Sequence, residues 1–312
     1  MHKLLAELED GFHGVIEALL IQVNRGVTAK GAPYLSFVLQ DKSGQIDAKY
    51  WNVSEEVLHQ YEAGMIVRIF ADVLSHQKQL QVRVNKMEII PSEDVDISLF
   101  VKEGRISKDE LKSSIFQILN EMKNENIKRI CLSILQDYEQ NFFLYPAAKR
   151  NHHDFVGGLA THVLGMMKLA KFMAQQYPLL NEDLLLSGVL LHDIGKLMEL
   201  SGAVITEYTV EGKLLGHISI MQSIVQQKAE ELGIQGEEVM LMRHMILSHH
   251  GHYEYGSPVL PLIPEAEILY LIDNIDARMH TMEKALVNVE KGEFSQRIFA
   301  LENRSFYKSK IE

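Results

Sequence analysis

Histidine and aspartate occur together behind apolar helical segments in the second half of the chain. The stretch LLHDIGK (190–196) places His192 and Asp193 side by side after an apolar run. Burying either group unpaired is costly, so the pair is either a satisfied cap or core pair, or a functional group. Ten of the fourteen histidines lie between residues 152 and 280. Histidine is the commonest metal ligand among side chains, so this clustering indicates a metal site.

Imidazole and carboxylate groups recur at the ends or inner faces of the predicted helices. The set comprises His162, His192, Asp193, His217, His249, His250 and Asp273. These donors suit Mn, Fe, Zn or Mg rather than a thiolate site. An aspartate beside a histidine can bridge two metal ions, and ions about 3.5–4 Å apart are a standard device for phosphate-ester hydrolysis. Any one of these residues alone is equally well explained as a solvated loop or helix-face group.

The elements that must position these residues are helices. Ser107 and Glu110 form a capping-box pair before an apolar pattern with helical spacing, and a second helix runs from residue 127 to 135. Helices are predicted over 161–177, over 182–193 with Asn181 as its cap, and over 264–280 starting on a proline.

The first 90 residues have the composition of strands instead. Segments 34–40, 45–51, 65–74 and 80–90 are short, rich in Val, Ile and aromatics, and partly alternating, with a short helix at 54–61. Roughly five strands suit a small closed barrel of the OB type, although a generic small barrel of unrelated use is the alternative. The acidic, proline-containing segment 91–98 is a predicted linker.

The apolar runs, the cysteine content and the net charge of the chain exclude several classes of protein. There is no apolar run of about 18 residues, and the N-terminus does not have the pattern of a secretory signal. The single cysteine, Cys131, excludes an internal disulfide and favours a reducing cytoplasm, and its apolar neighbours predict core packing. The net charge of −11 argues against coating of nucleic acid by charge alone but allows a local groove.

The ordered set from His162 to Asp273 resembles the HD superfamily of metal-dependent phosphohydrolases, in its dinuclear branch. A barrel preceding such a domain, together with AAKRNHHDFVGGLATHV (147–163) and the loop SHHGHYEYGSP, resembles the YhaM-type 3′→5′ exoribonucleases of Gram-positive bacteria. This resemblance covers almost the whole chain. It implies a two-domain α+β protein: an OB-fold nucleic-acid-binding domain (1–92), a linker with connecting helices (93–140) and an all-α HD domain (141–312).

The resemblance also implies ligands for two divalent ions, with Mn²⁺ favoured. One ion would take His162, His192, Asp193 and Asp273, and the other would take Asp193 as a bridge, His217, and His249, His250 or both. Asp193 and Lys196 would act in catalysis, since the Lys196 ammonium lies one helical turn on and can reach a phosphate oxygen. A surface lysine is the alternative for Lys196, while Asp276 is expected to orient a ligand histidine.

Two groups of residues are candidates for holding the substrate. The basic cluster before the first ligand comprises Lys149, Arg150, His152 and His153, and a solvated loop explains it equally well. The candidates in the barrel are Lys30, Tyr34, Lys49, Trp51 and Arg83. Alternation along strand 45–51 puts Lys49 and Trp51 on one face, although packing in the core or at the rim of the barrel is the alternative for Trp51. Residues 24–90 hold eight Lys or Arg against seven Asp or Glu, which permits only a modest groove.

The function implied is 3′→5′ hydrolysis of single-stranded RNA, and of single-stranded DNA, to nucleoside 5′-monophosphates by a two-metal hydroxide mechanism. The expected location is cytoplasmic, with no membrane partner, and homo-oligomerisation stays open. One alternative is a phosphodiesterase or nucleotidase acting on small nucleotides. Another is a nucleic-acid-binding adaptor whose HD core no longer turns over. The barrel favours the first function, because a free nucleotide needs no strand-binding groove.

Overall fold

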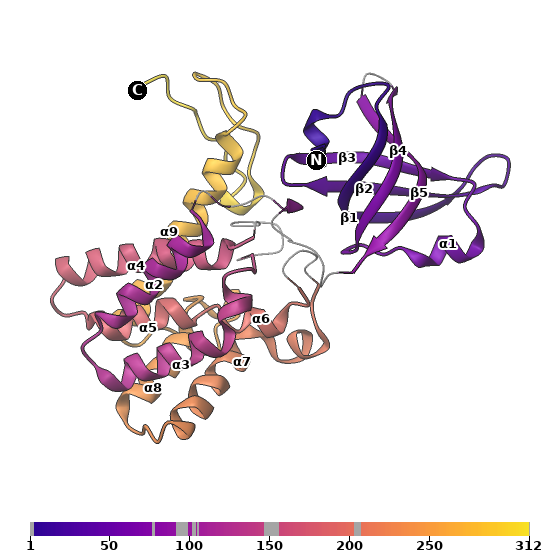
Figure 1. Ribbon diagram of the computed structural model, residues 1–312. Coiled ribbons are helices and arrows are strands. Elements are labelled where there is room, and N and C mark those ends of the chain that lie inside the picture. The colour runs from indigo at the N-terminus through magenta and orange to yellow at the C-terminus, as the bar shows by residue number, and fades with distance from the viewer. Residues whose placement is uncertain are drawn as a thin grey trace. The chain divides into compact units, whose positions relative to one another are not determined.

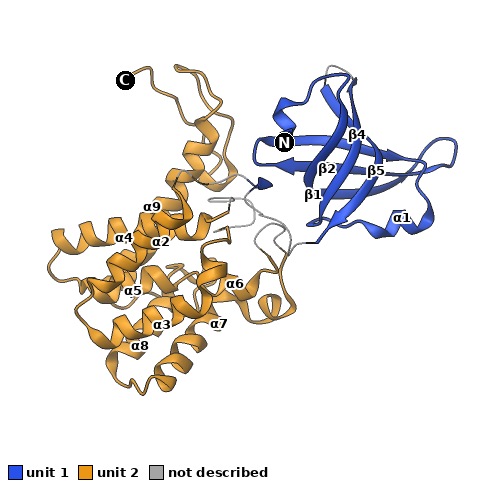
Figure 2. Ribbon diagram, viewed as in Figure 1, with its two compact units in different colours: residues 1–103 blue, residues 104–312 orange. Residues whose placement is uncertain are grey.

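The chain forms two compact units, residues 1–103 and 104–312 (Figure 2). The structure is a computed structural model that describes residues 3–76, 79–91, 99–101, 104, 106–146, 156–202 and 207–311. The first unit is a barrel of strands and the second is helical (Figure 1). The predicted fold class, a small β-barrel followed by an all-α domain, is therefore confirmed.

The first unit is a closed barrel with the strand order β1-β2-β3-β5-β4. Its elements are η1 (Leu5–Glu7), β1 (His13–Val27), β2 (Pro33–Asp41), β3 (Gly44–Trp51), α1 (Glu55–Gln60), β4 (Ile66–His76) and β5 (Gln79–Ile90). Neighbouring strands are antiparallel except β3 and β5, which are parallel and close the barrel. Ser54 caps α1 by accepting a hydrogen bond from the Val57 amide.

Strand β1 is the strand of the barrel for which the sequence pattern gave no range. It pairs with β4 through its first half and with β2 through its second half, and a register shift separates Leu20 from Gln22. Ala18, Leu19 and Leu20 are consecutive and all buried, so the alternation that marks a strand is lost at this bend. Val82 and Val84 face the core as predicted, but Leu80 is exposed because it lies beside the turn of the β4–β5 hairpin, paired with Ser75.

The second unit is built from helices. They are α2 (Lys108–Asn120), α3 (Glu125–Phe142), α4 (Gly158–Gln176), α5 (Glu182–Leu191), α6 (Lys196–Glu199), α7 (Val210–Glu231), α8 (Glu237–Ser248) and α9 (Pro264–Leu286), with short 3-10 turns η4 (Tyr253–Tyr255) and η5 (Phe299–Leu301). The predicted caps are confirmed: Ser107 accepts from the Glu110 amide and Asn181 from the Leu184 amide. Pro264 starts α9.

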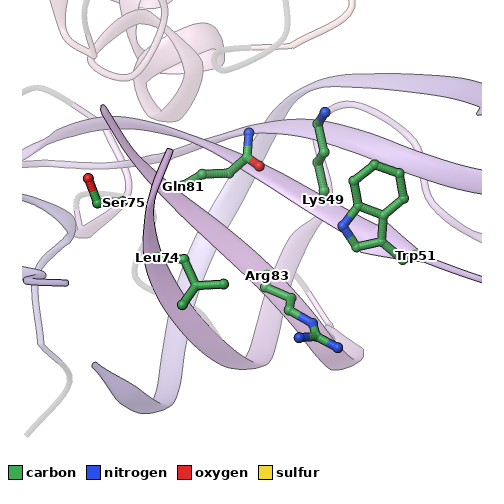
Figure 3. Close-up of a pocket in the computed structure, with 6 residues that line it drawn as sticks. All are labelled: Lys49, Trp51, Leu74, Ser75, Gln81 and Arg83. Carbon is green, nitrogen blue, oxygen red and sulfur yellow. The ribbon is translucent and has the colours of Figure 1, made fainter. Parts of the chain in front are cut away.

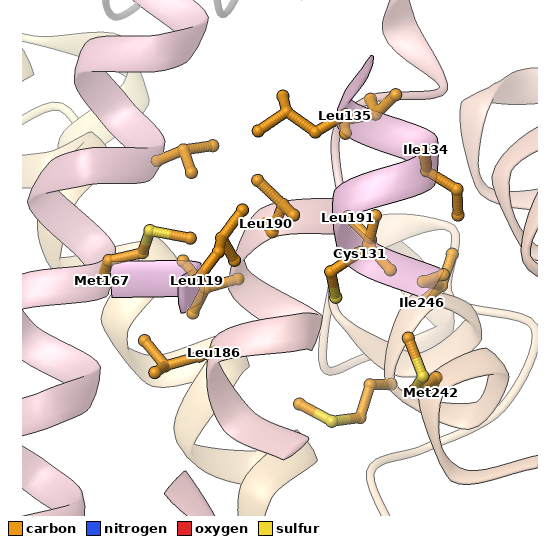
Figure 4. Packing of buried hydrophobic residues seen from close by; sticks show 14 of the residues in the cluster. Leu119, Cys131, Ile134, Leu135, Met167, Leu186, Leu190, Leu191, Met242 and Ile246 are labelled. Carbon is orange, nitrogen blue, oxygen red and sulfur yellow. The ribbon is translucent and has the colours of Figure 1, made fainter. Parts of the chain in front are cut away.

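A single apolar core runs through the helical unit. Cys131 and Ile134 of α3 pack among Leu190 and Leu191 of α5 and Ile246 of α8, all fully buried (Figure 4). Burial raises the pKa of the Cys131 thiol, as expected for a packing residue. This core fixes the ends of α5 and α8, which carry site residues. Within the described residues, no helix is long and apolar enough to cross a membrane.

Candidate metal centre and barrel surface

The histidines and aspartates singled out in the sequence converge in the helical unit. His162 lies in α4 and Asp273 in α9, while His192 and His249 occupy the C-cap positions of α5 and α8. His217 lies in α7 directly after Gly216, whose φ of 71° interrupts the helix. That left-handed conformation suits glycine, because other residues pay a steric cost there. Helix ends and a kink therefore deliver His192, His249 and His217, while regular helix delivers His162 and Asp273.

The potential ligands form two groups. The candidate donor atoms of His162, His192 and Asp193 lie within 4.8 Å of one another, and so do those of a second group, His217, His249 and His250. The imidazoles of the two groups form one continuous cluster, since the ring centroids of His192 and His249 are 5.1 Å apart. Asp273, which the resemblance assigned to the first ion, is in neither group, and the division of ligands between two ions stays a prediction.

Asp193 lies between the two groups. Its Oδ2 is 3.4 Å from Nε2 of His192, and its Oδ1 is 3.7 Å from Nε2 of His217. One carboxylate oxygen thus faces each group. A carboxylate in this position has an oxygen available on each side for a divalent metal ion.

The Nδ1 atoms of the histidines are used to hold the rings in place. Nδ1 of His192 lies 2.9 Å from the Val189 carbonyl oxygen, and Nδ1 of His249 lies 2.8 Å from that of Ile246. Both acceptors lie three residues back, in the last turn of the helix that the histidine ends. A carbonyl only accepts, so Nδ1 carries the proton and donates it. In the neutral ring, Nε2 then presents a lone pair, as metal-ligating histidines do.

The Nε2 atoms of three of the histidines support the fit of a metal ion. Nε2 of His192, His217 and His249 is buried and has no hydrogen-bond partner among the described residues. Unsatisfied buried polar atoms are rare in folded proteins and call for an explanation such as a bound ion. Neutral imidazoles beside ionised carboxylates are also the donors that Mn²⁺, Fe²⁺ and Zn²⁺ accept. The residues present therefore fit a divalent-metal centre.

Glu199, at the end of α6, was not singled out from the sequence. Its carboxylate accepts a hydrogen bond from the His217 amide at 3.2 Å and lies 3.2 Å from Nδ1 of the same residue. Burial raises the pKa of Glu199, but the hydrogen bonds from His217 outweigh this and lower it overall. Glu199 thus orients His217 as a carboxylate behind a ligand histidine does. The only hint in the sequence is its position one helical turn after Lys196.

Asp193 is ionised although it is almost fully buried. Burial raises its pKa, but the charge of Lys196 above all, together with the contact to His192, outweighs that effect and holds the pKa well below its ordinary value. Lys196 Nζ donates to Oδ2 of Asp193 at 2.6 Å. Burial lowers the pKa of Lys196, but Asp193 outweighs this effect and raises the pKa overall. The ammonium predicted near the metal position is therefore present, charged and fixed against the central carboxylate.

His162 is held between two carboxylates of α9. Its Nδ1 lies 2.7 Å from Oδ2 of Asp276, and its Nε2 lies 3.3 Å from Oδ1 of Asp273. Burial lowers the pKa of His162, but the two carboxylates raise it to about 9. The contact with Asp276 is the orienting bond expected from the sequence. A metal ion at Nε2 would compete with the proton that Asp273 stabilises there.

His249 and His250 have the opposite electrostatic environment. Burial lowers the pKa of both rings, and the neighbouring imidazoles His192 and His217, respectively, lower it further. Their ring centroids are 4.3 Å apart. Both imidazoles are therefore neutral at pH 7, which is the state that ligates metals.

In the barrel, Trp51 lies on the surface and not in the core. It is 38% exposed, whereas its strand neighbour Ala48 is buried, as the predicted alternation requires. The rings of Tyr34 and Trp51 are 4.8 Å apart, and Lys49 Nζ lies 5.0 Å from the Trp51 centroid. Core packing is therefore wrong for Trp51, because the residue belongs to the outer face of β3, while packing at the barrel rim against Tyr34 stays an alternative to base stacking.

A hollow of about 180 Å³ adjoins this aromatic pair. It is lined by Lys49 and Trp51 of β3, Leu74 and Ser75 of β4, and Gln81 and Arg83 of β5 (Figure 3). The parallel β3–β5 pairing sets Lys49 opposite Arg83, which brings two cations to one rim. Aromatic rings beside cations in a groove suit the bases and phosphates of a single strand.

Among the remaining substrate candidates, the structure describes Lys30. It is exposed in the β1–β2 turn and does not line the hollow. Lys149, Arg150, His152 and His153 lie outside the described residues.

Comparison with protein families agrees with both halves of this description. Residues 159–278 match the model of the HD domain, and residues 15–90 match that of the OB-fold nucleic acid binding domain. The chain thus joins an OB-fold barrel to a helical HD domain, and an HD domain indicates a metal-dependent phosphohydrolase.

Solved structures include three OB-fold or single-strand-binding proteins similar to part of the chain. The second OB-fold domain of replication protein A from Methanococcus maripaludis is 22% identical, covers 31% of this chain and 100% of its own, and has a TM-score of 0.25. A replication protein A heterotrimer bound to ssDNA is 18% identical over 31% of this chain and 67% of its own (TM-score 0.22). The single-stranded DNA binding protein from Thermus aquaticus is 12% identical over 26% and 41% (TM-score 0.24).

Proposed function

We propose that the protein is a 3′→5′ exoribonuclease of the YhaM type, which shortens single-stranded RNA, and single-stranded DNA, to nucleoside 5′-monophosphates. It would use two divalent ions per chain, with Mn²⁺ favoured. The observation that carries this proposal is the position of Asp193. Its two carboxylate oxygens face two groups of buried histidines. This arrangement suits two ions acting on one phosphodiester.

The site residues have separate roles in the proposal. His162, His192, Asp193 and Asp273 hold one ion, and Asp193, His217, His249 and His250 hold the other. When bound, the ions supply Lewis acidity and an activated water. Asp276 and Glu199 keep His162 and His217 in the orientation that binding needs.

The reaction is a hydrolysis of the last phosphodiester of the strand. The oxygen of the water bonds to phosphorus, and the bond from phosphorus to the 3′-oxygen of the preceding nucleotide breaks. That oxygen leaves with a proton as the new 3′-hydroxyl, and the released product is a nucleoside 5′-monophosphate. Lys196 stabilises the charge that develops on the phosphoryl oxygens, because its ammonium is already fixed beside Asp193.

The barrel holds the strand in this proposal. Trp51 and Tyr34 stack on bases, and Lys49 and Arg83 contact phosphates. The basic segment with Lys149, Arg150, His152 and His153 would contact phosphates near the first ligand. Because residues 24–90 are almost balanced in charge, binding by the barrel should depend only modestly on salt.

The test is a time course with 5′-end-labelled single-stranded RNA and Mn²⁺. The full chain should give a ladder that shortens from the 3′ end, and metal analysis should find two Mn²⁺ ions per chain. Asp193→Asn should lose both properties, since its amide cannot bridge two cations. Asp137→Asn, which removes an exposed carboxylate of α3, serves as the matched control and should retain both.

The other outcomes separate the alternatives. RNA left intact while small phosphodiesters are hydrolysed would replace the proposal with a phosphodiesterase on small nucleotides. A chain that binds RNA but retains no metal would be an adaptor. Shortening from the 5′ end, or internal cuts, would contradict the proposed direction.

A further inference from the structure

The loop after α8 ties one candidate ligand to an exposed aromatic side chain. Nδ1 of His250 donates to the carbonyl oxygen of Tyr255 at 2.7 Å, across the 3-10 turn η4. The backbone of Tyr255 therefore sets the orientation of the His250 ring. Its side chain remains 63% exposed. Tyr255 thus carries an exposed aromatic ring and also holds one candidate metal ligand, His250, through its backbone.

The Tyr255 ring is held in place although it is exposed. Its centroid is 5.3 Å from that of His252 at 83°, and the His252 ring is in turn 5.4 Å from that of Tyr270 at 85°. Edge-to-face contacts of this kind stabilise a ring pair by about 0.5–1.5 kcal/mol. The Tyr255 ring is therefore fixed by its neighbours, and among the described residues none covers its exposed part.

Tyr270 connects this aromatic group to the other side of the centre. It lies in α9, one turn before Asp273, and residues three apart are neighbours on a helix surface. The aromatic group thus joins the segment of His250 to the segment of Asp273. A nucleotide whose phosphate lies at the centre has one aromatic part, its base, and an exposed ring on a ligand-bearing loop offers that base a stacking partner.

We propose that Tyr255 forms a nucleobase subsite of the metal centre, stacking on the base of the 3′-terminal nucleotide that is removed. This inference rests on the proposed function and adds a recognition element in the helical unit, separate from the barrel. Stacking accepts every base, because each has a π-face, so the subsite selects a nucleotide without selecting a sequence.

The chain offers a matched control for this subsite. Tyr253 lies in the same turn and is 61% exposed, but it makes no ring contact with another described residue. Its backbone does not contact a candidate ligand. Tyr253→Ala therefore removes an equally exposed tyrosine without removing the proposed platform.

The test compares the affinities of AMP and ribose 5-phosphate for the Mn²⁺-loaded full chain by titration calorimetry. AMP carries the base and ribose 5-phosphate lacks it, so their affinity ratio reports stacking. The chain should bind AMP about tenfold more tightly, in line with stacking on one aromatic ring. Tyr255→Ala should reduce this ratio to about one, while Tyr255→Phe and Tyr253→Ala should keep it.

The other results would overturn the inference. An equal fall in ribose 5-phosphate affinity, or loss of Mn²⁺, in Tyr255→Ala would mean that the residue only supports the loop. A ratio abolished by Trp51→Ala and unchanged by Tyr255→Ala would assign base stacking to the barrel. RNA shortening is followed in parallel: an intact RNA with a normal AMP preference would reject the exoribonuclease and keep the subsite.

Discussion

The buried carboxylate of Asp193 has two kinds of partner, histidines and a lysine. Histidines approach both of its oxygens, and Lys196 donates to Oδ2. A buried carboxylate without such partners would be protonated or strongly destabilising. Its ionised state is therefore produced by the same residues that would bind metal and substrate around it. The role of Lys196 can be tested separately from metal binding, because Lys196 can be replaced while every candidate metal ligand remains.

Lys196→Gln should lower kcat for RNA by about 100- to 1000-fold, the usual effect of removing one group that stabilises transition-state charge. Metal content should remain, since glutamine still donates to Asp193. Steady-state kinetics and metal analysis on the same sample check this. Lys228→Gln, which removes a surface ion pair with Asp137, is the control and should leave kcat unchanged. A fall in metal content equal to the fall in kcat would mean that Lys196 acts only by holding Asp193.

At the residue scale, the sequence predicted which side chains could bind a metal ion better than it predicted the residues that hold those side chains in place. The ordered set with His192, Asp193 and Asp273 pointed to a metal centre because few other roles need these groups together at the ends and inner faces of helices. Glu199 could not be predicted, because its contact with His217 depends on how α6 packs against α7. The exposed position of Trp51 likewise depends on strand pairing, which alternation alone does not determine.

At the element scale, the close approach of α6 and α7 depends on Gly195. A methyl group at this position would overlap the carbonyl oxygen of His217, which is backbone and cannot turn aside. Gly195→Ala should therefore push the two helices apart and destabilise the helical unit by about 1–3 kcal/mol, as overpacking does. Because His217 would move with its backbone, Mn²⁺ affinity should fall as well.

Urea unfolding followed by far-ultraviolet circular dichroism, and a Mn²⁺ titration, check the effect of Gly195→Ala. Gly44→Ala is the control, because a Cβ at Gly44 meets no atom within 4 Å and its φ is not positive. Unchanged stability together with unchanged Mn²⁺ affinity would show that the contact between α6 and α7 adjusts without cost.

The segment after α9 is attached to that helix by a charged clamp. Arg278 donates to both carboxylate oxygens of Glu302 at 2.8 and 2.9 Å, and Arg304 also contacts Glu302. Arg278 first, and then Arg304, lower the pKa of Glu302 to about 2. A lowered carboxyl pKa means that the clamp contributes fully above the ordinary glutamate pKa of about 4.3 and is lost as the pH falls through about 2.

The Glu302 carboxyl carbon, observed by NMR, should therefore keep its ionised chemical shift from pH 7 down to about pH 3. Arg278→Ala should move its titration midpoint toward about 4.3, since the principal donor is gone. A midpoint near 4.3 in the unaltered chain would show that the clamp is not formed in solution.

Helix boundaries were predictable where capping chemistry marks them. Ser107, Asn181 and Pro264 each start a helix at the expected place because their side chains satisfy, or do not need, the free amides of a first turn. Strand β1 was not predicted, since its bend lets consecutive residues be buried and removes the period of two.

At the scale of the whole molecule, each unit has a hydrophobic core of its own. The barrel core includes Ile16, Leu35 and Val67, and the helical core is a separate cluster built from α2 to α9. Two cores predict two unfolding transitions, because burial within one unit does not depend on burial within the other. The chain has one tryptophan, Trp51, so its fluorescence reports on the barrel, whereas ellipticity at 222 nm reports mainly on the helices.

A metal bound only by the helical unit should stabilise only that unit. At a free Mn²⁺ concentration of about 100 times Kd, the stabilisation amounts to about 2.7 kcal/mol. We therefore expect Mn²⁺ to raise the midpoint of the ellipticity transition and EDTA to lower it, while the Trp51 midpoint stays where it was. Asp193→Asn should abolish the response, since it removes the carboxylate shared by both groups of histidines. A Trp51 midpoint that follows the metal would contradict independent cores, because it requires energetic coupling between the units.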